Sequence, residues 1–164
     1  MTKAASKSAA ESQKDAEARL SGFIEKFEPR HQALIRAVRE ELRARFPAAT
    51  ELVYDNYNFF VIGYSPTERP SDAIVSIAAG ANGVSLCFIH GARLPDPGKI
   101  LLGSGKQTRF VRLGAASVLS QPEVRALLAA AVAQSSTPFQ EGGRSKLIIK
   151  SISAKQRPCR AAAR

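Results

Sequence analysis

A glycine-rich segment ending in lysine, LLGSGKQTRFVRLG at residues 101–114, contains the residue types of a phosphate-binding loop. A Walker-type loop needs Gly, four residues and then Gly-Lys-Ser/Thr, followed by a helix whose N-terminus faces the phosphate. Counting from Gly105 and Lys106, Ile100 stands where the first glycine belongs and Gln107 where the hydroxyl belongs. The segment that follows, TRFVRL, predicts a strand. The spacing therefore excludes a Walker-type nucleotide site.

A weaker role remains for the same loop, because glycine N–H groups in a turn can form an anion-binding nest. Basic side chains lie on or just after the loop, at Lys106, Arg109 and Arg112, and on the segment that leads into it, at Arg93 and Lys99. We therefore predict a contact with a simple anion, or with the acidic group of a small ligand. The candidates are Arg93, Gly103, Gly105, Lys106 and Arg109. The alternative is a basic hairpin turn whose charges are only solvated.

A second polar cluster, YDNYNF at residues 54–59, lies where the sequence predicts the start of a strand. Asp and Asn favour turns because their side chains bond nearby backbone groups. The functional alternative is the rim of a pocket, with aromatic walls and a polar group that orients a ligand. Its candidate residues are Tyr54, Asp55, Asn56 and Tyr57.

His90 follows the apolar run VSLCFI and could transfer a proton or contact a ligand, although a lone histidine in a turn is more often structural. The chain has no HxxH, HExxH or CxxC spacing, so no zinc or iron site is predicted. Cys87 lies within that apolar run and is expected to act as a small hydrophobic residue. We therefore predict no catalytic residue, no metal and no cofactor.

Hydrophobic periodicity predicts the secondary structure. A 3.6-residue period indicates helices near 13–27, 29–46 and 121–134, the last opened by a capping box of Ser120 and Glu123. A period of two indicates strands at 57–62, 73–79, 84–89 and 108–113, with an Asn-Gly turn between the second and the third. Residues 146–152, KLIIKSI, either add an edge strand or dock loosely.

Because strands joined by short turns pair antiparallel, this order predicts an α+β fold. An antiparallel sheet of about four to five strands would be packed by two N-terminal helices and one C-terminal helix. The domain would cover residues 13–134, between a disordered tail at 1–12 and a basic C-terminal extension at 135–164.

The composition is that of one soluble domain, with 164 residues, 45% hydrophobic and 23% charged. Two cysteines, no secretory signal and no long apolar run predict a cytoplasmic protein without a membrane partner. The net charge of +10 is concentrated at the end, where residues 135–164 contain seven Lys or Arg and one Glu. Such a tail attracts polyanions without sequence preference, and it is also the usual composition of a solvated, disordered end.

Residues from about 51 to 132 resemble the YdhG-like family, a domain of unknown function found mainly in bacteria. The resemblance rests on ELVYDNYNFF, GVSLCFIHGARLPDP and LLGSGKQTRFVRL, together with the closing helix. It implies the same α+β fold. Some members are described as iron chaperones resembling frataxin, which would require exposed carboxylates. The scattered acidic residues of this chain argue against that activity.

Three functions follow as hypotheses. The first is a non-enzymatic binding domain for a small molecule or anion, with a pocket between the sheet and the turns at 54–58 and 90–106. The second is a nucleic-acid-associated accessory protein that binds non-specifically through its basic tail. The third is an enzyme or a frataxin-like iron chaperone. The protein would act as a monomer or a homodimer.

Overall fold

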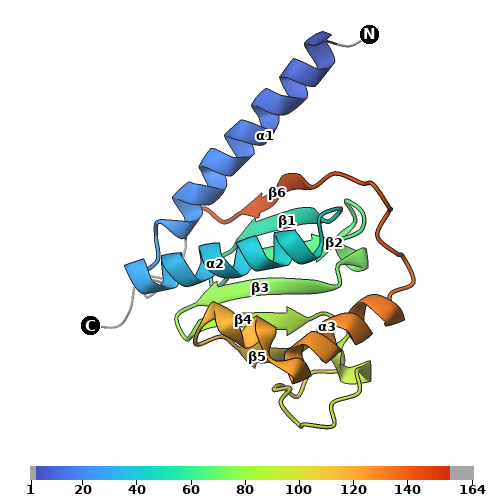
Figure 1. Cartoon of the computed structure of the whole chain (residues 1–164). Helices are drawn as coiled ribbons and strands as arrows, with labels where there is room; N and C mark the ends of the chain where they lie inside the picture. The colour runs from blue at the N-terminus through green and yellow to red at the C-terminus, as the bar shows by residue number, and fades with distance from the viewer. Residues whose placement is uncertain (1–2, 156–164) are drawn as a thin grey trace.

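In the computed structural model, which describes residues 3–155 and the side chains from Ser12 onward, three α-helices pack against a six-stranded sheet (Figure 1). The helices are α1 (Lys3–Ile24), α2 (Pro29–Arg45) and α3 (Pro122–Gln134). The strands are β1 (Thr50–Asp55), β2 (Phe60–Ser65), β3 (Val75–Gly80), β4 (Gly83–Phe88), β5 (Arg109–Arg112) and β6 (Lys146–Ile152). The predicted α+β class is confirmed.

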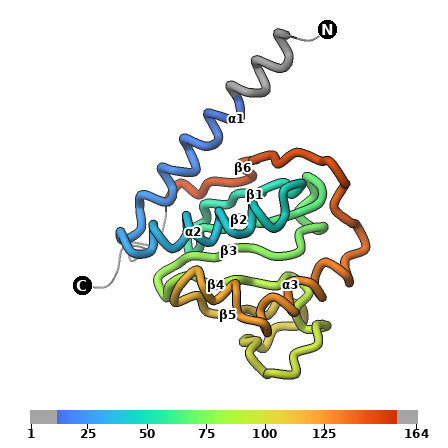
Figure 2. Tube along the Cα trace, viewed as in Figure 1, coloured from blue at the N-terminus to red at the C-terminus, as the bar shows by residue number. Residues whose placement is uncertain are grey.

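The sheet is mixed, with the strand order β5-β4-β3-β2-β1-β6. Strands β1 to β5 pair antiparallel, whereas β6 pairs parallel with β1. The connection after α3 passes the ends of the central strands and places β6 beside β1 (Figure 2). The prediction of a purely antiparallel sheet of four to five strands is therefore wrong. Residues 146–152, assigned to the C-terminal extension, form the edge strand of the sheet.

The predicted strand at 57–62 begins three residues too early, because residues 56–59 form the turn of a hairpin and β2 begins at Phe60. Strands β1 and β2 flank a turn at residues 56–59, in which the Asn56 N–H donates to the Phe59 carbonyl at 3.0 Å. The turn-forming Asp and Asn residues thus interrupt the apolar run. Strands near 73–79, 84–89 and 108–113 are confirmed as β3, β4 and β5. The Asn-Gly turn joins β3 to β4, and Gly83 has a φ of 107° there.

The helix predictions are confirmed in number, and two of the helices begin differently. Helix α1 begins at Lys3, within the segment predicted to be disordered. Helix α3 begins with Pro122 after the N-cap residue Gln121, which makes no side-chain cap hydrogen bond. The predicted capping box is absent because Ser120 belongs to a short 3₁₀ turn, Ala116–Ser120. Proline suits the first helical position, where its missing N–H costs nothing.

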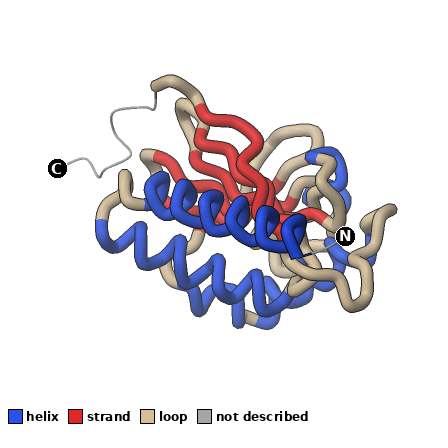
Figure 3. Tube along the Cα trace, turned by 90° about the horizontal axis from the view of Figure 1, so that it is seen from above, coloured by secondary structure: helices blue, strands red, loops and turns tan. Residues whose placement is uncertain are grey.

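All three helices lie on one face of the sheet (Figure 3). Alternate strand residues point into this helix layer and are fully buried, among them Phe60, Ile62, Leu86 and Phe88. The predicted burial of Leu86 and Phe88 is confirmed. They pack in one cluster with Leu20 of α1, Ile35 and Leu42 of α2, and Leu128 of α3.

A buried ion-pair network ties α1 and α2 to the sheet. Glu51 of β1 is 1% exposed and accepts two hydrogen bonds from the Arg39 guanidinium, at 2.9 and 3.0 Å. The Tyr64 hydroxyl also donates to Glu51, at 2.9 Å. Arg39 reaches Glu17 of α1 as well, at 2.6 and 3.0 Å, and this bonding lowers the pKa of Glu17. Within residues 3–155, no helix is long and apolar enough to cross a membrane.

Candidate functional site

The face of the sheet opposite the helices carries mostly small side chains at its centre. Strand register places these outward residues in two cross-strand rows. One row runs from β2 to β5 through Val61, Ala78, Ser85 and Arg112, and the next through Gly63, Ser76, Cys87 and Phe110. Because cross-strand neighbours on one face lie side by side, the small residues together form a low floor.

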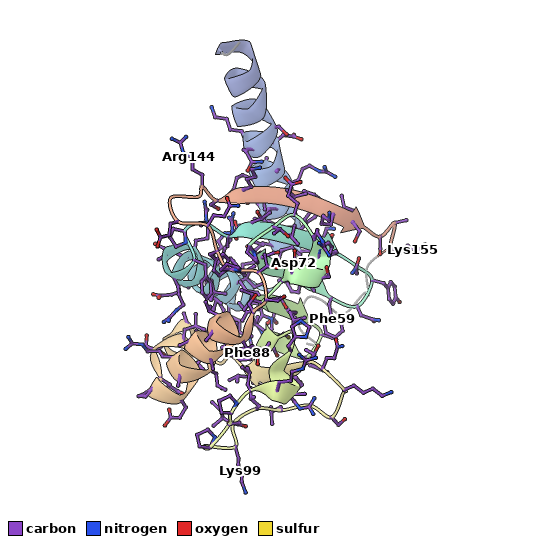
Figure 4. All side chains as sticks on the ribbon, turned by 90° about the vertical axis from the view of Figure 1, so that its right-hand side faces the viewer. Phe59, Asp72, Phe88, Lys99, Arg144 and Lys155 are labelled. Atoms are coloured by element: carbon purple, nitrogen blue, oxygen red, sulfur yellow. The ribbon has the colours of Figure 1, made fainter. Side chains whose placement is uncertain are left out.

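Larger side chains surround this floor and make a hollow of about 340 Å³, which we call the outer-face hollow. Phe59 and Val61 lie on one side, and Ile89, Thr108 and Phe110 on the other. Phe59 is 53% exposed and lies on the opposite side of the sheet from α3, whereas Phe88 is buried (Figure 4). The lining is mainly apolar, as is usual for a ligand site.

The rest of the outer face is covered by the connection between β2 and β3. Ala73 of this connection and Leu52 of β1 both lie beside Gly63, and Leu52 is fully buried. Glu68 holds the same connection to β6, since its carbonyl accepts a hydrogen bond from Lys150 and its carboxylate pairs with Lys146 at 3.6 Å. The open part of the outer face is therefore the half formed by β2 to β5.

Cys87 lies in the floor of the outer-face hollow as a half-buried free thiol. Burial raises the pKa of Cys87, and a hydrogen bond from Ser76 and the positive charge of Arg112 oppose the rise. The net effect keeps the sulfur protonated near neutral pH, so it is a poor nucleophile.

Arg112 provides the charge at the edge of the hollow. Its guanidinium lies over the Phe110 ring, 5.2 Å from the centroid. Nη1 donates to the Asn82 carbonyl at 3.3 Å and to the Ser85 hydroxyl at 3.5 Å. Among the described residues, no carboxylate lies within ion-pair distance of this guanidinium. Within the described part of the chain, the hollow thus combines a mainly apolar lining with a cation that has no acidic partner.

Of the predicted site residues in the YDNYNF segment, Asp55 and Asn56 hold the β1–β2 hairpin in place. Asp55 is fully buried and pairs with Lys26 of α1 at 2.9 Å. The Asn56 side chain accepts a hydrogen bond from Ser151 of β6 at 2.9 Å. Tyr54 is half-buried, and burial raises the pKa of its hydroxyl. Tyr57 is 48% exposed at the tip of the hairpin.

His90 and Arg93 line a smaller hollow of about 130 Å³, at the C-terminus of α3. Asp72, Gln134, Ser136 and Thr137 are among its other lining residues. The His90 Nδ1 atom is buried and has no hydrogen-bond partner among the described residues. Its carbonyl accepts a hydrogen bond from the Gln134 amide at 3.1 Å.

The glycine-rich loop is an exposed turn in which Gly103, Gly105 and Lys106 all face solvent. The Arg109 guanidinium donates to the carbonyls of Gly105 and Thr108, so its charge is directed at the loop's own backbone. The loop is held to the sheet by a bridge between Leu102 and Phe110.

The structure separates the two groups of predicted residues. The hairpin at 56–59 lies at the end of the sheet where Phe60 pairs with Ala79 and Ala79 with Val84. His90 and the glycine-rich loop lie at the other end, beyond the pair of Phe88 and Arg109. The turns at 54–58 and 90–106, which were predicted to border one pocket together with the sheet, therefore lie at opposite ends of the sheet.

Sequence reasoning singled out Cys87 and Arg112 separately, but it missed the outer-face hollow that they line together with small side chains of β3 and β4. The signal was present in VSIAAGANGVSLCF, where small residues alternate with large apolar ones. The large residues of this segment indicate the core face, and the small ones between them lie on the opposite face, where they form a surface.

Within the described part of the chain, no three His, Cys, Asp or Glu residues lie close enough together to hold a metal ion. The comparisons with protein-family models, with curated proteins and with solved structures found no match for this chain.

Proposed function

We propose that this protein is a non-enzymatic binding domain for a small, mostly apolar molecule, and that the outer-face hollow is its binding site. The observation that carries the proposal is the group of small side chains, Ser76, Ala78, Ser85 and Cys87, on the face of the sheet opposite the three α-helices (Figure 3). Small residues on an open sheet leave room for a ligand, whereas large ones would fill it.

The size and lining of the hollow agree with this role. Its volume of about 340 Å³ lies at the lower end of the range for ligand sites, which is roughly 300–1,000 Å³. A bound molecule would remove apolar surface of Phe59, Val61 and Phe110 from water, and such burial stabilises a complex by about 25 cal/mol per Å² before the costs of association. The floor offers hydroxyls and a protonated thiol, which suit hydrogen bonding better than nucleophilic attack.

Binding of a neutral aromatic probe, naphthalene-2-carboxamide, tests the proposal by calorimetry and thermal shift. A ligand that binds the native state raises the unfolding midpoint by mass action. Ala78→Leu puts a larger side chain into the floor, so we expect it to weaken binding at least tenfold. Ala129→Leu, at an exposed position of α3, is the matched control and should bind like the wild type. Absence of binding to the wild type, or equal binding by both variants, would refute the proposal.

Other predictions from the sequence stay predictions. These are the resemblance to the YdhG-like family, the cytoplasmic location and the iron-chaperone alternative. Nucleic-acid binding through the basic tail belongs with them, since residues 156–164 lie outside the described part of the chain. Of the described basic residues in this segment, Lys146 and Lys150 contact Glu68.

A further inference from the structure

We infer that the molecule bound in the outer-face hollow is a planar aromatic acid, whose carboxylate binds Arg112. This inference rests on the proposed function and names the chemical class of its ligand. Three features of the hollow support it: an oriented guanidinium, the absence of an opposite charge, and a flat apolar surface of suitable length.

The Arg112 guanidinium is held in place before any ligand arrives. The Phe110 ring supports one side of it at 5.2 Å, and the Asn82 carbonyl and Ser85 hydroxyl accept hydrogen bonds from Nη1. These contacts leave the other guanidinium N–H groups for a ligand. A guanidinium matches the two oxygens of a carboxylate, and an oriented one loses less freedom on binding.

The charge of Arg112 has no counterpart in the hollow. Of the described residues that line it, Arg112 is the one with a full charge, and none is Asp or Glu. An acidic ligand would therefore meet one cation and no repelling carboxylate. The smaller hollow differs, because the Asp72 carboxylate lines it together with His90 and Arg93, so an acidic ligand would meet a like charge there.

Strand register sets the size of the rest of the ligand. From Arg112 the row passes Ser85 and Ala78 and ends at Val61, which lies three strands away. Neighbouring strands are about 4.8 Å apart, so the row spans roughly 14 Å. A carboxylate at Arg112 therefore leaves room for a body of about two fused rings over Ser85 and Ala78. Phe59 and Val61 close the far side.

The test compares two probes with the same rings, naphthalene-2-carboxylate and naphthalene-2-carboxamide, by titration calorimetry. We expect the wild type to bind the acid at least tenfold more tightly than the amide. Raising the salt concentration from 0.1 to 1 M should weaken binding of the acid more than that of the amide, because an exposed ion contact is screened. Arg112→Gln should abolish the preference and leave binding of the amide within about threefold.

Arg125→Gln, which removes the same charge from the exposed face of α3, should keep the preference. Equal binding of acid and amide by the wild type would overturn the inference and leave the proposed function standing. Failure of the wild type to bind the amide would overturn the proposed function itself. If Arg112→Gln does not fold, Arg112→Lys takes its place in the test. We expect this variant to prefer the acid over the amide less strongly than the wild type does, and the remaining preference to fall as salt is added. An unchanged preference for the acid would contradict the guanidinium contact.

Discussion

At the scale of single residues, the pH dependence of Cys87 modification tests whether this thiol is buried in the floor of the outer-face hollow. Burial raises the pKa of Cys87, and a group with a raised pKa forms its thiolate only at higher pH. In a Cys159→Ser background, the rate of Cys87 modification by a thiol reagent should therefore reach half its maximum at a higher pH than that of N-acetylcysteine amide, whose carboxylate is blocked as in a peptide. Ser76→Ala should move the midpoint higher still, because it removes a hydrogen bond that favours the thiolate. A midpoint at or below that of the free thiol would contradict the burial of Cys87.

A second residue-scale prediction concerns Arg39. Arg39→Met leaves the buried Glu51 carboxylate without its two charged donors, and breaking such a pair costs about 3–5 kcal/mol of unfolding free energy. Arg43→Met is the control, because Arg43 is 44% exposed and lies 3.7 Å from Glu51. Arg43→Met should lower the free energy of unfolding by less than about 1 kcal/mol. Urea denaturation measures both, and similar losses for the two variants would contradict the network as described.

The same residues show what the sequence could predict and what it could not. Burial of Leu86 and Phe88 follows from local alternation, and it is confirmed. Asp55 stands in a run of turn-forming residues, and its ion pair depends on Lys26, 29 residues earlier. Arg109 was a candidate because of its charge, but its guanidinium bonds neighbouring carbonyls. Side-chain partners of this kind depend on the tertiary fold.

At the scale of elements, the exposed edge of β6 is protected by α1. The Leu147 N–H donates to the Gln13 side-chain oxygen at 2.9 Å, and the Gln13 amide donates to the Leu147 carbonyl at 3.1 Å. The Gln13 side chain thus bonds the two backbone groups that a neighbouring strand would otherwise bond. This makes the edge of β6 less available for pairing with a further strand. Gln13→Ala should lower the free energy of unfolding by about 1–2 kcal/mol, because two backbone groups lose their partners.

Amide hydrogen exchange locates this effect. In Gln13→Ala the Leu147 amide should exchange much faster, while amides in β3 keep their protection. Lys14→Ala, at an exposed neighbouring position, should change neither quantity. Unchanged exchange at Leu147 in Gln13→Ala would show that the side chain does not protect the edge.

Two glycines test how β4 and β5 are connected. A Cβ on Gly91 would lie 2.7 Å from the Arg109 Cβ and 2.9 Å from its backbone nitrogen, so Gly91→Ala must displace β5. We expect a loss of about 1–3 kcal/mol, as is usual for overpacking. Gly105→Ala, in the glycine-rich loop, meets no atom within 4 Å and should be nearly neutral. Chemical denaturation compares them, and a neutral Gly91→Ala would contradict this close approach.

Element prediction succeeded where the pattern is local. Helix α2 and strands β3 to β5 follow from periodicity and from the Asn-Gly turn. The β1–β2 hairpin was misread because apolar residues lie on both sides of a short polar turn. Strand β6 could be placed only once β1 was known, since their parallel pairing joins residues that are far apart in the chain. No local pattern specifies such a partner.

At the scale of the whole molecule, the two faces of the sheet have different roles. One face packs against three helices and forms the core. The other is partly covered by the β2–β3 connection and elsewhere leaves the outer-face hollow, with Arg112 at its edge. Every strand that contributes to the floor of the hollow packs its other face against the core.

The central claim is that this hollow binds a small aromatic molecule, and a nuclear magnetic resonance titration of the full chain with naphthalene-2-carboxylate tests it most directly. We predict that the amide signals of Ser76, Ala78, Ser85 and Cys87 shift together and saturate at one equivalent, while those of Ser136 and Thr137 stay in place. Shifts confined to Ser136 and Thr137, or to the loop at 103–106, with the β3 and β4 signals unchanged, would contradict the account.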